Sequence, residues 1–104
     1  MTNQLTLETR THTHCFQTFD IGTPFKNVSA VYVFSRRNLN GSHQIIYVGQ
    51  TKGLADRFAN HHRASCIKSH GANKVSILQI GEESTRLRIE AELINRYNPI
   101  CNQT

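Results

Sequence analysis

AVYVF (residues 30–34) and QIIYV (residues 44–48) are the two segments of the chain richest in β-branched and aromatic residues. Such segments favour β-strands. The residues between them, 35–42, are mostly polar and contain Asn40-Gly41, a dipeptide typical of turns. The pattern therefore predicts a β-hairpin with a long connection.

The sequence after the hairpin predicts two helices and one more strand. A helix is expected over residues 54–66 and a strand over residues 74–80. A last helix should begin with Glu82-Glu83, whose charges suit the positive end of the helix dipole, and stop before Pro99. The core order is β-β-α-β-α, and we predict an α/β (α+β) fold with a small three-stranded sheet flanked by helices.

Residues 1–27 are interpreted as an N-terminal extension, with a possible extra strand, that precedes a domain of residues 28–104. His12, His14 and Cys15 in the extension offer metal ligands. A structural zinc site normally uses four ligands in two close pairs, and only one pair is visible here. We therefore interpret this segment as a polar strand or tail.

The cysteines and the hydropathy of the sequence indicate the cellular compartment of the protein. Cys15, Cys66 and Cys101 form an odd set without CxxC spacing, which indicates reduced cytosolic thiols. No apolar run reaches transmembrane length, and the polar residues 1–10 do not resemble a signal peptide. We expect a cytoplasmic protein without a membrane partner.

Positive charge is concentrated in the middle of the chain. The whole sequence has twelve Lys and Arg against seven Asp and Glu, a net charge of +5, whereas charges cancel within residues 1–27. Residues 36–74 hold seven basic side chains and only one acidic residue, Asp56. Apart from Arg57, these basic residues are our candidate nucleic-acid contacts: Arg36, Arg37, Lys52, Arg63, Lys68 and Lys74. The alternative is an ordinary basic surface.

Glu90 occupies an unusual place in the last predicted helix. On a helical wheel it falls within a broad apolar arc formed by Leu87, Ile89, Ala91, Leu93, Ile94 and Tyr97. Burying a carboxylate is costly unless a cation, a metal or hydrogen-bond donors compensate it. Two readings stay open for Glu90: a metal ligand, or a salt bridge with a basic residue of the first helix. Glu92 falls on the polar face and is expected to be solvated and paired with Arg96.

The first predicted helix supplies possible partners for Glu90. Arg57 and His61 are four residues apart and therefore share one helix face. A cation that neutralises phosphate, a titratable ring and a hard oxygen ligand are the components of a phosphodiesterase site.

At this point the sequence resembles the GIY-YIG nuclease superfamily over most of residues 28–104. The segments 30–32 (AVY) and 47–49 (YVG) resemble the two elements that name the family. The remaining matches keep family-like spacing: Arg57 eight residues after Gly49, His61 four further on, Glu90 in the last helix, and Asn102 twelve after Glu90. The order β-β-α-β-α also agrees with the family core.

The resemblance implies a role for each matched residue. Tyr32 would activate a water or relay its proton, and His61 would accept that proton or pass it on. Tyr47 would position water or phosphate, and Arg57 would stabilise charge on the scissile phosphate. The remaining two residues would hold and brace the site: Glu90 as the one protein ligand of a single Mg²⁺ (or Mn²⁺), and Asn102 as a support.

The chain departs from the family pattern in several places. Ala30 replaces the first glycine, and the loop at residues 36–41 lengthens the interval between the two tyrosines. The extension has no counterpart that we can assign. We expect no appended DNA-binding module, and therefore weak sequence preference, or specificity supplied by a protein partner or a homo-oligomer.

The leading hypothesis is a metal-dependent endonuclease that hydrolyses phosphodiester bonds in DNA by a one-metal mechanism. Two alternatives stay open. One is a non-catalytic nucleic-acid-binding module with the same fold, although none of the matched positions is replaced. The other is a nuclease that acts on RNA, because the sequence does not place the polar groups that would recognise a 2′-OH.

Overall fold

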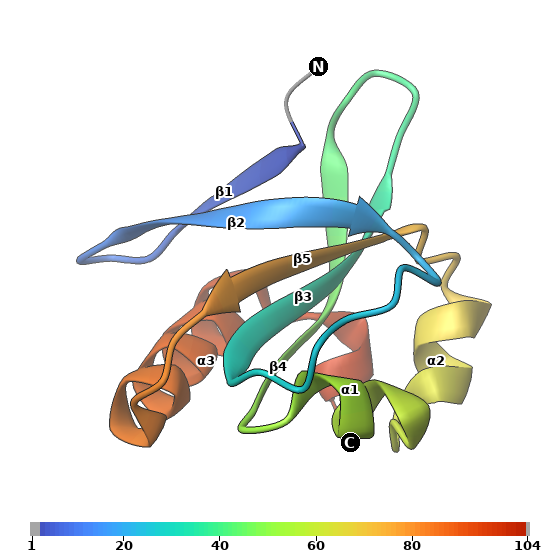
Figure 1. The fold of residues 1–104 in the computed structure, drawn as a ribbon. Coiled ribbons are helices and arrows are strands. Elements are labelled where there is room, and N and C mark those ends of the chain that lie inside the picture. The colour runs from blue at the N-terminus through green and yellow to red at the C-terminus, as the bar shows by residue number, and fades with distance from the viewer. Residues whose placement is uncertain (1–2, 104) are drawn as a thin grey trace.

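The computed structural model describes residues 3–103 and places them in an α+β fold (Figure 1). In chain order the elements are β1 Gln4–Glu8, β2 Thr13–Asp20, β3 Ala30–Arg37, β4 His43–Thr51, α1 Leu54–Ala59, α2 Ala64–Ser69, β5 Lys74–Gln79, α3 Glu83–Tyr97 and the 3₁₀ turn η1 Ile100–Asn102. The predicted hairpin is present as β3 and β4. Both strands are longer than expected, so residues 38–42 alone connect them.

The described strands form one antiparallel sheet in the order β1-β2-β5-β3-β4. The prediction of a three-stranded sheet is therefore wrong, since the sheet has five strands. The extra strands come from the N-terminal extension: β2 pairs with β5, and β1 pairs with β2. Leu5 and Leu7 are buried and alternate with exposed Gln4, Thr6 and Glu8, the pattern of a half-buried strand.

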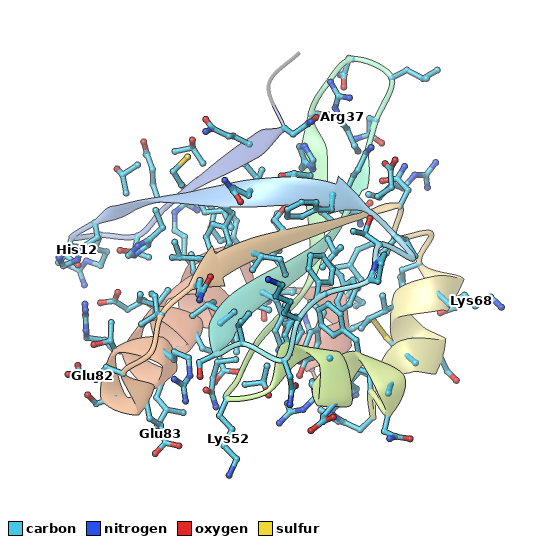
Figure 2. All side chains as sticks on the ribbon, viewed as in Figure 1. His12, Arg37, Lys52, Lys68, Glu82 and Glu83 are labelled. Carbon is cyan, nitrogen blue, oxygen red and sulfur yellow. A yellow bond between two sulfur atoms is a disulfide. The ribbon has the colours of Figure 1, made fainter. Side chains whose placement is uncertain are left out.

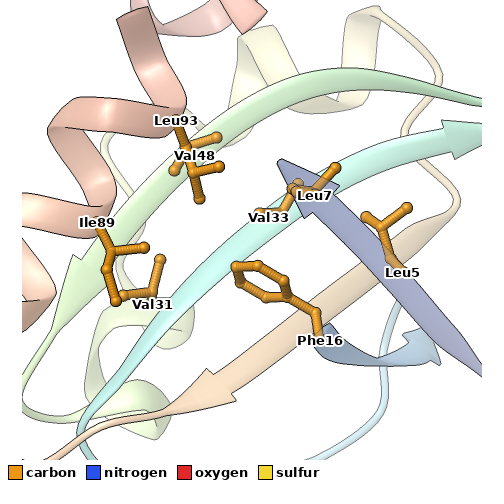
Figure 3. Packing of buried hydrophobic residues seen from close by; sticks show 8 residues of the cluster. All are labelled: Leu5, Leu7, Phe16, Val31, Val33, Val48, Ile89 and Leu93. Carbon is orange, nitrogen blue, oxygen red and sulfur yellow. The ribbon is translucent and has the colours of Figure 1, made fainter. Parts of the chain in front are cut away.

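One face of the sheet, to which the β1–β2 hairpin contributes, packs against α3. Val31, Val33 and Val48 point toward this side, where Ile89 and Leu93 of α3 meet them (Figure 3). The hairpin completes the same cluster with Leu5, Leu7 and Phe16. Burying each such side chain stabilises the fold by about 1.5–3 kcal/mol. The extension is thus a part of the core.

The opposite face carries aromatic residues and is covered by α1 and α2. Ala30 and Tyr32 of β3 join Ile46 and Tyr47 of β4 in a second buried cluster with Leu54 of α1. The pairing of β3 with β4 shifts by one residue after Phe34, which is a β-bulge. The bulge lets two consecutive residues of β4, Ile46 and Tyr47, join this cluster.

The helix predicted over residues 54–66 is two short helices, α1 and α2, with a break between them. The chain leaves the helical conformation at Asn60. The backbone N–H of Arg63 donates to the ring Nδ1 of His61 at 3.0 Å, in place of the carbonyl that a continuous helix would offer. At this break, Nδ1 of His61 therefore accepts a hydrogen bond from the backbone.

The buried face of α3 differs from the predicted apolar arc. Leu87 is 45% exposed and Ala91 is also exposed, whereas Arg86 is only 2% exposed. Glu92 is half-buried, and its ion-pair partner is Arg88 at 3.8 Å. The expected pairing of Glu92 with Arg96 is wrong, because the Arg96 guanidinium lies over the ring of Tyr97.

Cys66 of α2 and Cys101 of η1 form a disulfide, and Cys15 is free and exposed. The expectation of three reduced thiols is therefore wrong for this pair. The two cysteines are 35 residues apart, and they meet because the chain after α3 returns to α2. Among the residues that the structure describes, no helix is long and apolar enough to cross a membrane.

Candidate active site

Tyr32, Tyr47 and His61 meet on the aromatic face of the sheet. The Tyr32 hydroxyl lies 2.8 Å from Nε2 of His61. The ring centroids of Tyr47 and His61 are 4.9 Å apart, and those of the two tyrosines are 6.1 Å apart. Phe34 of β3 and Phe58 of α1 pack edge-on against the Tyr32 ring and tilted against each other, and they close the group toward α1. Three polar groups are therefore held in an aromatic setting by adjacent strands and the turn after α1.

Gly49 makes this approach possible. It pairs directly with Tyr32 across β3 and β4. A Cβ atom at Gly49 would overlap Cζ and Oη of Tyr32 and would lie 2.8 Å from Cε2 of Tyr47. The absence of a side chain at this position lets both phenol rings cross the strand toward His61.

The hydrogen bonds of His61 determine which ring nitrogen carries its proton. Nδ1 accepts the N–H of Arg63, so the proton of the neutral ring lies on Nε2. His61 therefore donates to the oxygen of Tyr32. Burial, followed by the electrostatic effects of His62 and Arg57, lowers the pKa of His61 to about 4, so the ring is neutral at pH 7.

Both tyrosines are buried acids beside a cation. Burial, together with the other phenol, raises the pKa of Tyr32 well above its ordinary value, and the Arg57 guanidinium opposes that rise. Burial also raises the pKa of Tyr47, with a further contribution from the Glu90 carboxylate. Arg57 is thus the nearby charge that favours a phenolate here.

Glu90 of α3 borders the same group and is half-buried. Burial raises the pKa of its carboxyl group, while the backbone N–H of Gln50 and the charge of Arg57 lower it. The ion pairs found within residues 3–103 are Lys74–Asp20 and Arg88–Glu92, so the alternative of a salt bridge for Glu90 is not realised there. Glu90 keeps a carboxylate beside Tyr47 and Arg57 that offers hard oxygen donors, which suit Mg²⁺.

Gln50 connects Glu90 and Arg57, and the sequence reasoning missed it. Its carbonyl oxygen accepts a long hydrogen bond of 3.5 Å from Arg57 Nη1. Its side-chain oxygen accepts from Nε of the buried Arg86 at 3.0 Å. Arg86 also donates to the carbonyls of Ile80 and Gly81, at 3.2 and 2.7 Å. One signal in the sequence could have pointed to this network. Arg86 lies four residues before Glu90, so the two side chains share one face of the helix.

A cavity of about 400 Å³ lies between the end of β4, α1 and the start of α3. Its charged lining consists of the basic Lys52, Arg57 and Arg86 and the acidic Asp56 and Glu83. The recess is therefore polar with one more basic than acidic side chain, and its Arg57 offers a guanidinium that can bind a phosphate group.

Asn102 lies against the outer edge of β4. Its side-chain oxygen accepts the N–H of Val48 at 2.9 Å, and its amide donates to the carbonyl of Val48 at 2.8 Å. These two bonds reproduce what a neighbouring strand would make. Asn102 therefore fixes the strand segment that carries Tyr47 and Gly49.

The predicted nucleic-acid contacts lie in different places. Arg37, Lys52 and Lys68 project from three separate edges of the molecule (Figure 2). Lys74 is ion-paired with Asp20, and Arg63 donates to the carbonyl of Gln103 at 3.3 Å. Arg36 is exposed at the end of β3. Lys52 lines the recess with Arg57, Lys68 lines a cavity with His61, and Arg63 donates its N–H to His61.

Comparison with protein families assigns most of this chain. Residues 29–103 match the model of the GIY-YIG catalytic domain. These residues include each position that the sequence comparison singled out, from Tyr32 to Asn102, together with Gly49 and Gln50.

Individual proteins give a similar result. The chain is 30% identical over 88 residues to UvrABC system protein C from Fervidobacterium nodosum; the match covers 81% of this chain and 15% of that protein. Two crystal structures of the GIY-YIG N-terminal endonuclease domain of UvrC from Thermotoga maritima, both point mutants bound to the catalytic divalent cation, superpose with a TM-score of 0.60. They are 23% and 21% identical, and each comparison covers 76% of this chain and 87% of the solved domain.

Proposed function

This chain belongs to the GIY-YIG family of catalytic domains, and on that premise we propose that it is an endonuclease that hydrolyses phosphodiester bonds in DNA with one divalent metal ion. The observation that carries the proposal is the 2.8 Å hydrogen bond between the Tyr32 hydroxyl and Nε2 of His61. The carboxylate of Glu90 borders these residues and takes part in neither of the two ion pairs described above. Glu90 would hold the ion, which is Mg²⁺ or Mn²⁺. When bound, the ion supplies Lewis-acid stabilisation to the charge that develops on the phosphate.

The proton path follows from the hydrogen bonds of His61. Because Nδ1 is engaged by Arg63, His61 donates from Nε2 and stabilises a Tyr32 phenolate instead of accepting its proton. Tyr32 first loses its proton to solvent, and the phenolate then takes a proton from the attacking water as the water oxygen bonds to phosphorus. The bond between phosphorus and the leaving oxygen breaks in the same displacement, and that oxygen takes a proton from solvent. This assignment differs from the relay role that the family resemblance implied for His61.

The other residues position the substrate. Arg57 neutralises a phosphate oxygen from the rim of the recess, and Tyr47 orients the water or the phosphate beside Glu90. Asn102 holds β4, through Val48, in the geometry that these contacts need.

DNA is the proposed substrate because the similar solved domains are endonuclease domains of UvrC and the similar curated protein is component C of the UvrABC system. The chain spans about 15% of the length of that relative. We propose that a protein partner or a second copy of the chain contributes to the recognition of a particular DNA sequence or structure. An RNA substrate and a non-catalytic binding role are the alternatives that the assay below separates.

The test is cleavage of plasmid, single-stranded DNA, branched DNA and RNA in Mg²⁺, Mn²⁺ or EDTA. We expect cleavage of DNA, lost in EDTA. Loss of an outer partner of a metal ligand already weakens metal sites by ~10–100-fold, so Glu90→Gln should slow cleavage by more than ~100-fold. Glu92→Gln, two residues along α3, is the matched control and should cleave normally. Equal loss in both variants, or binding of DNA without cleavage by the wild type, would overturn the proposal.

A further inference from the structure

The side chains of Cys66, His70 and Cys101 form a cluster where α2 meets η1. Their ligand atoms all lie within 4.8 Å of one another. Nδ1 of His70 is 3.7 Å from the sulfur of Cys66 and 3.7 Å from the sulfur of Cys101. Cys66 and His70 are four residues apart at the end of α2, so they face the same direction, and η1 brings Cys101 to them.

We propose that the chain, when this disulfide is reduced, binds one Zn²⁺ through Cys66, His70 and Cys101. In a tetrahedral zinc site with Zn–S of ~2.3 Å and Zn–N of ~2.05 Å, sulfur and nitrogen ligands lie ~3.6 Å apart. Both sulfur–nitrogen distances of the cluster, 3.7 Å, already have this value. Only the two sulfurs have to move, to a separation of ~3.8 Å in the same geometry.

The redox step that opens the site is thiol–disulfide exchange with a dithiol reductant. The dithiol transfers two electrons and two protons to the Cys66–Cys101 bond and becomes a disulfide itself. Zn²⁺ then replaces the two thiol protons, which pass to solvent. The disulfide and the zinc site are therefore mutually exclusive states of the same residues.

The tautomer of His70 is free to change for this purpose. Nδ1 lies 2.9 Å from the carbonyl oxygen of Cys66 and donates to it in the disulfide state. His70 is exposed, so its proton can reside on Nε2, where water accepts it, while Nδ1 binds the ion. Because His70 is exposed and Cys66 is half-buried, water can fill the fourth position.

The chemistry of the ligands separates this site from Glu90. Thiolate and imidazole groups favour Zn²⁺, whereas the carboxylate of Glu90 favours Mg²⁺. In either state a cross-link joins α2 to η1, next to Asn102, whose side chain braces β4. The zinc site would thus keep that brace in place when the disulfide is reduced.

The experiment uses the full chain, reduced with a phosphine and freed of metal, and titrated first with Co²⁺ and then with Zn²⁺. We expect a thiolate-to-cobalt charge-transfer band, displaced by one Zn²⁺ per chain, and no band in the oxidised chain. Cys66→Ser and His70→Asn should weaken Zn²⁺ binding by at least ~10-fold. Loss of a residue that only hydrogen-bonds to a metal ligand already lowers metal affinity by that factor, and these variants remove a ligand itself. Cys101 is left unchanged because it is fully buried, and a substitution there would disturb the core.

Cys15→Ser is the matched control, because Cys15 is exposed and free. It should bind like the wild type, as should Glu90→Gln, which removes the other metal ligand. A reduced wild-type chain that binds no more Zn²⁺ than Cys66→Ser would overturn the proposal. So would loss of the charge-transfer band in Cys15→Ser or in Glu90→Gln.

Discussion

The two faces of strands β3 and β4 differ in kind although neighbouring residues build them. On the face toward α3, Val31, Val33 and Val48 pack with other aliphatic side chains and with Phe16. On the face toward α1 and α2, Tyr32 and Tyr47 lie beside the ring of His61, with Arg57 and Glu90 at the border. The alternation of a strand thus places a dry core on one side and titratable groups on the other.

The comparison shows which contacts the site needs from the rest of the fold. The apolar face holds the strands in place and includes the β1–β2 hairpin, which sequence reasoning treated as an appendage. The aromatic face depends on a missing side chain at Gly49 and on a break in a helix at His61. Substitutions on the first face should therefore change stability, and those on the second should change catalysis.

The largest effect is expected from Gly49→Ala. The added methyl group would overlap the Tyr32 ring and crowd Tyr47, so the rings must shift away from His61. We expect the cleavage rate to fall by more than ~100-fold, as for loss of one acid–base group. The free energy of unfolding should fall by about 1–3 kcal/mol, the usual cost of overpacking. Single-turnover cleavage and denaturant unfolding measure the two effects.

Gly81→Ala is the control for that substitution. Gly81 has no heavy atom within 4 Å of the position where a Cβ would lie, so it should tolerate the methyl group. If Gly49→Ala cleaved DNA as well as Gly81→Ala, the close packing of the phenol rings would have no catalytic role.

The second prediction compares adjacent residues of β3 that point to opposite faces. Tyr32→Phe keeps the ring, so stability should change little while the cleavage rate falls by about 100-fold. Val33→Ala removes two methyl groups from the fully buried core and should cost about 2 kcal/mol of stability, with a near-normal rate below its melting temperature. Unfolding curves and single-turnover rates on both variants test the division. A Tyr32→Phe enzyme with a normal rate would remove Tyr32 from the chemistry.

Local sequence signals predicted the elements of the catalytic core. The hairpin of β3 and β4 follows from its β-branched and aromatic segments, and α3 ends before Pro99 as expected. These two features depend on residues close in sequence, which is why they could be read without a structure. The prediction that Arg57 and His61 share one helix face is wrong, because α1 ends at Ala59.

The features that were missed depend on contacts between distant residues. β2 finds its partner β5 more than fifty residues later, so its half-buried pattern alone could not add it to the sheet. Arg86 is buried because Gln50 and two backbone carbonyls accept hydrogen bonds from its guanidinium. These acceptors lie outside α3, so a helical wheel of α3 cannot show them. The disulfide between Cys66 and Cys101 likewise requires the return of η1 to α2.

The third prediction extends the two-face comparison to the exposed end of β3. Arg36 alternates with Tyr32 on the site face, and its side chain lies near Gly71 after α2. Arg37 lines a cavity with residues of β1 and β2 on the opposite face. If DNA follows the site face, Arg36→Gln should lower the slope of log K against log salt by ~0.9 on duplex DNA, and Arg37→Gln should leave it unchanged.

Binding measured by fluorescence anisotropy at several salt concentrations gives these slopes. Equal changes in both variants would mean that DNA crosses the end of the strand and not one face. No change in either would place the loop at residues 38–42 away from the substrate.

The smallest effect concerns the titration of His61, for which we expect no inflection in the pH–rate profile. Burial holds the pKa of His61 near 4, and the Arg63 N–H occupies its Nδ1, so the ring should stay neutral from pH 5 upward. The pH–rate profile should therefore rise with pH as Tyr32 ionises, without an inflection near 6.5. As pH falls from 6.5 toward 4, the unfolded chain binds a proton at His61 that the folded chain does not, so the free energy of unfolding should fall in that window.

NMR titration of the ring, assigned with His61→Asn, measures the pKa directly, and the rate profile of the same variant shows what the ring contributes. His61→Asn removes the donor to Tyr32, and its loss of rate should add little to that of Tyr32→Phe in the double variant, since the two act as a unit. An inflection near pH 6.5 that disappears in His61→Asn would contradict this account. His61 would then be a base that accepts the Tyr32 proton, and the Arg63 contact would have to open during catalysis.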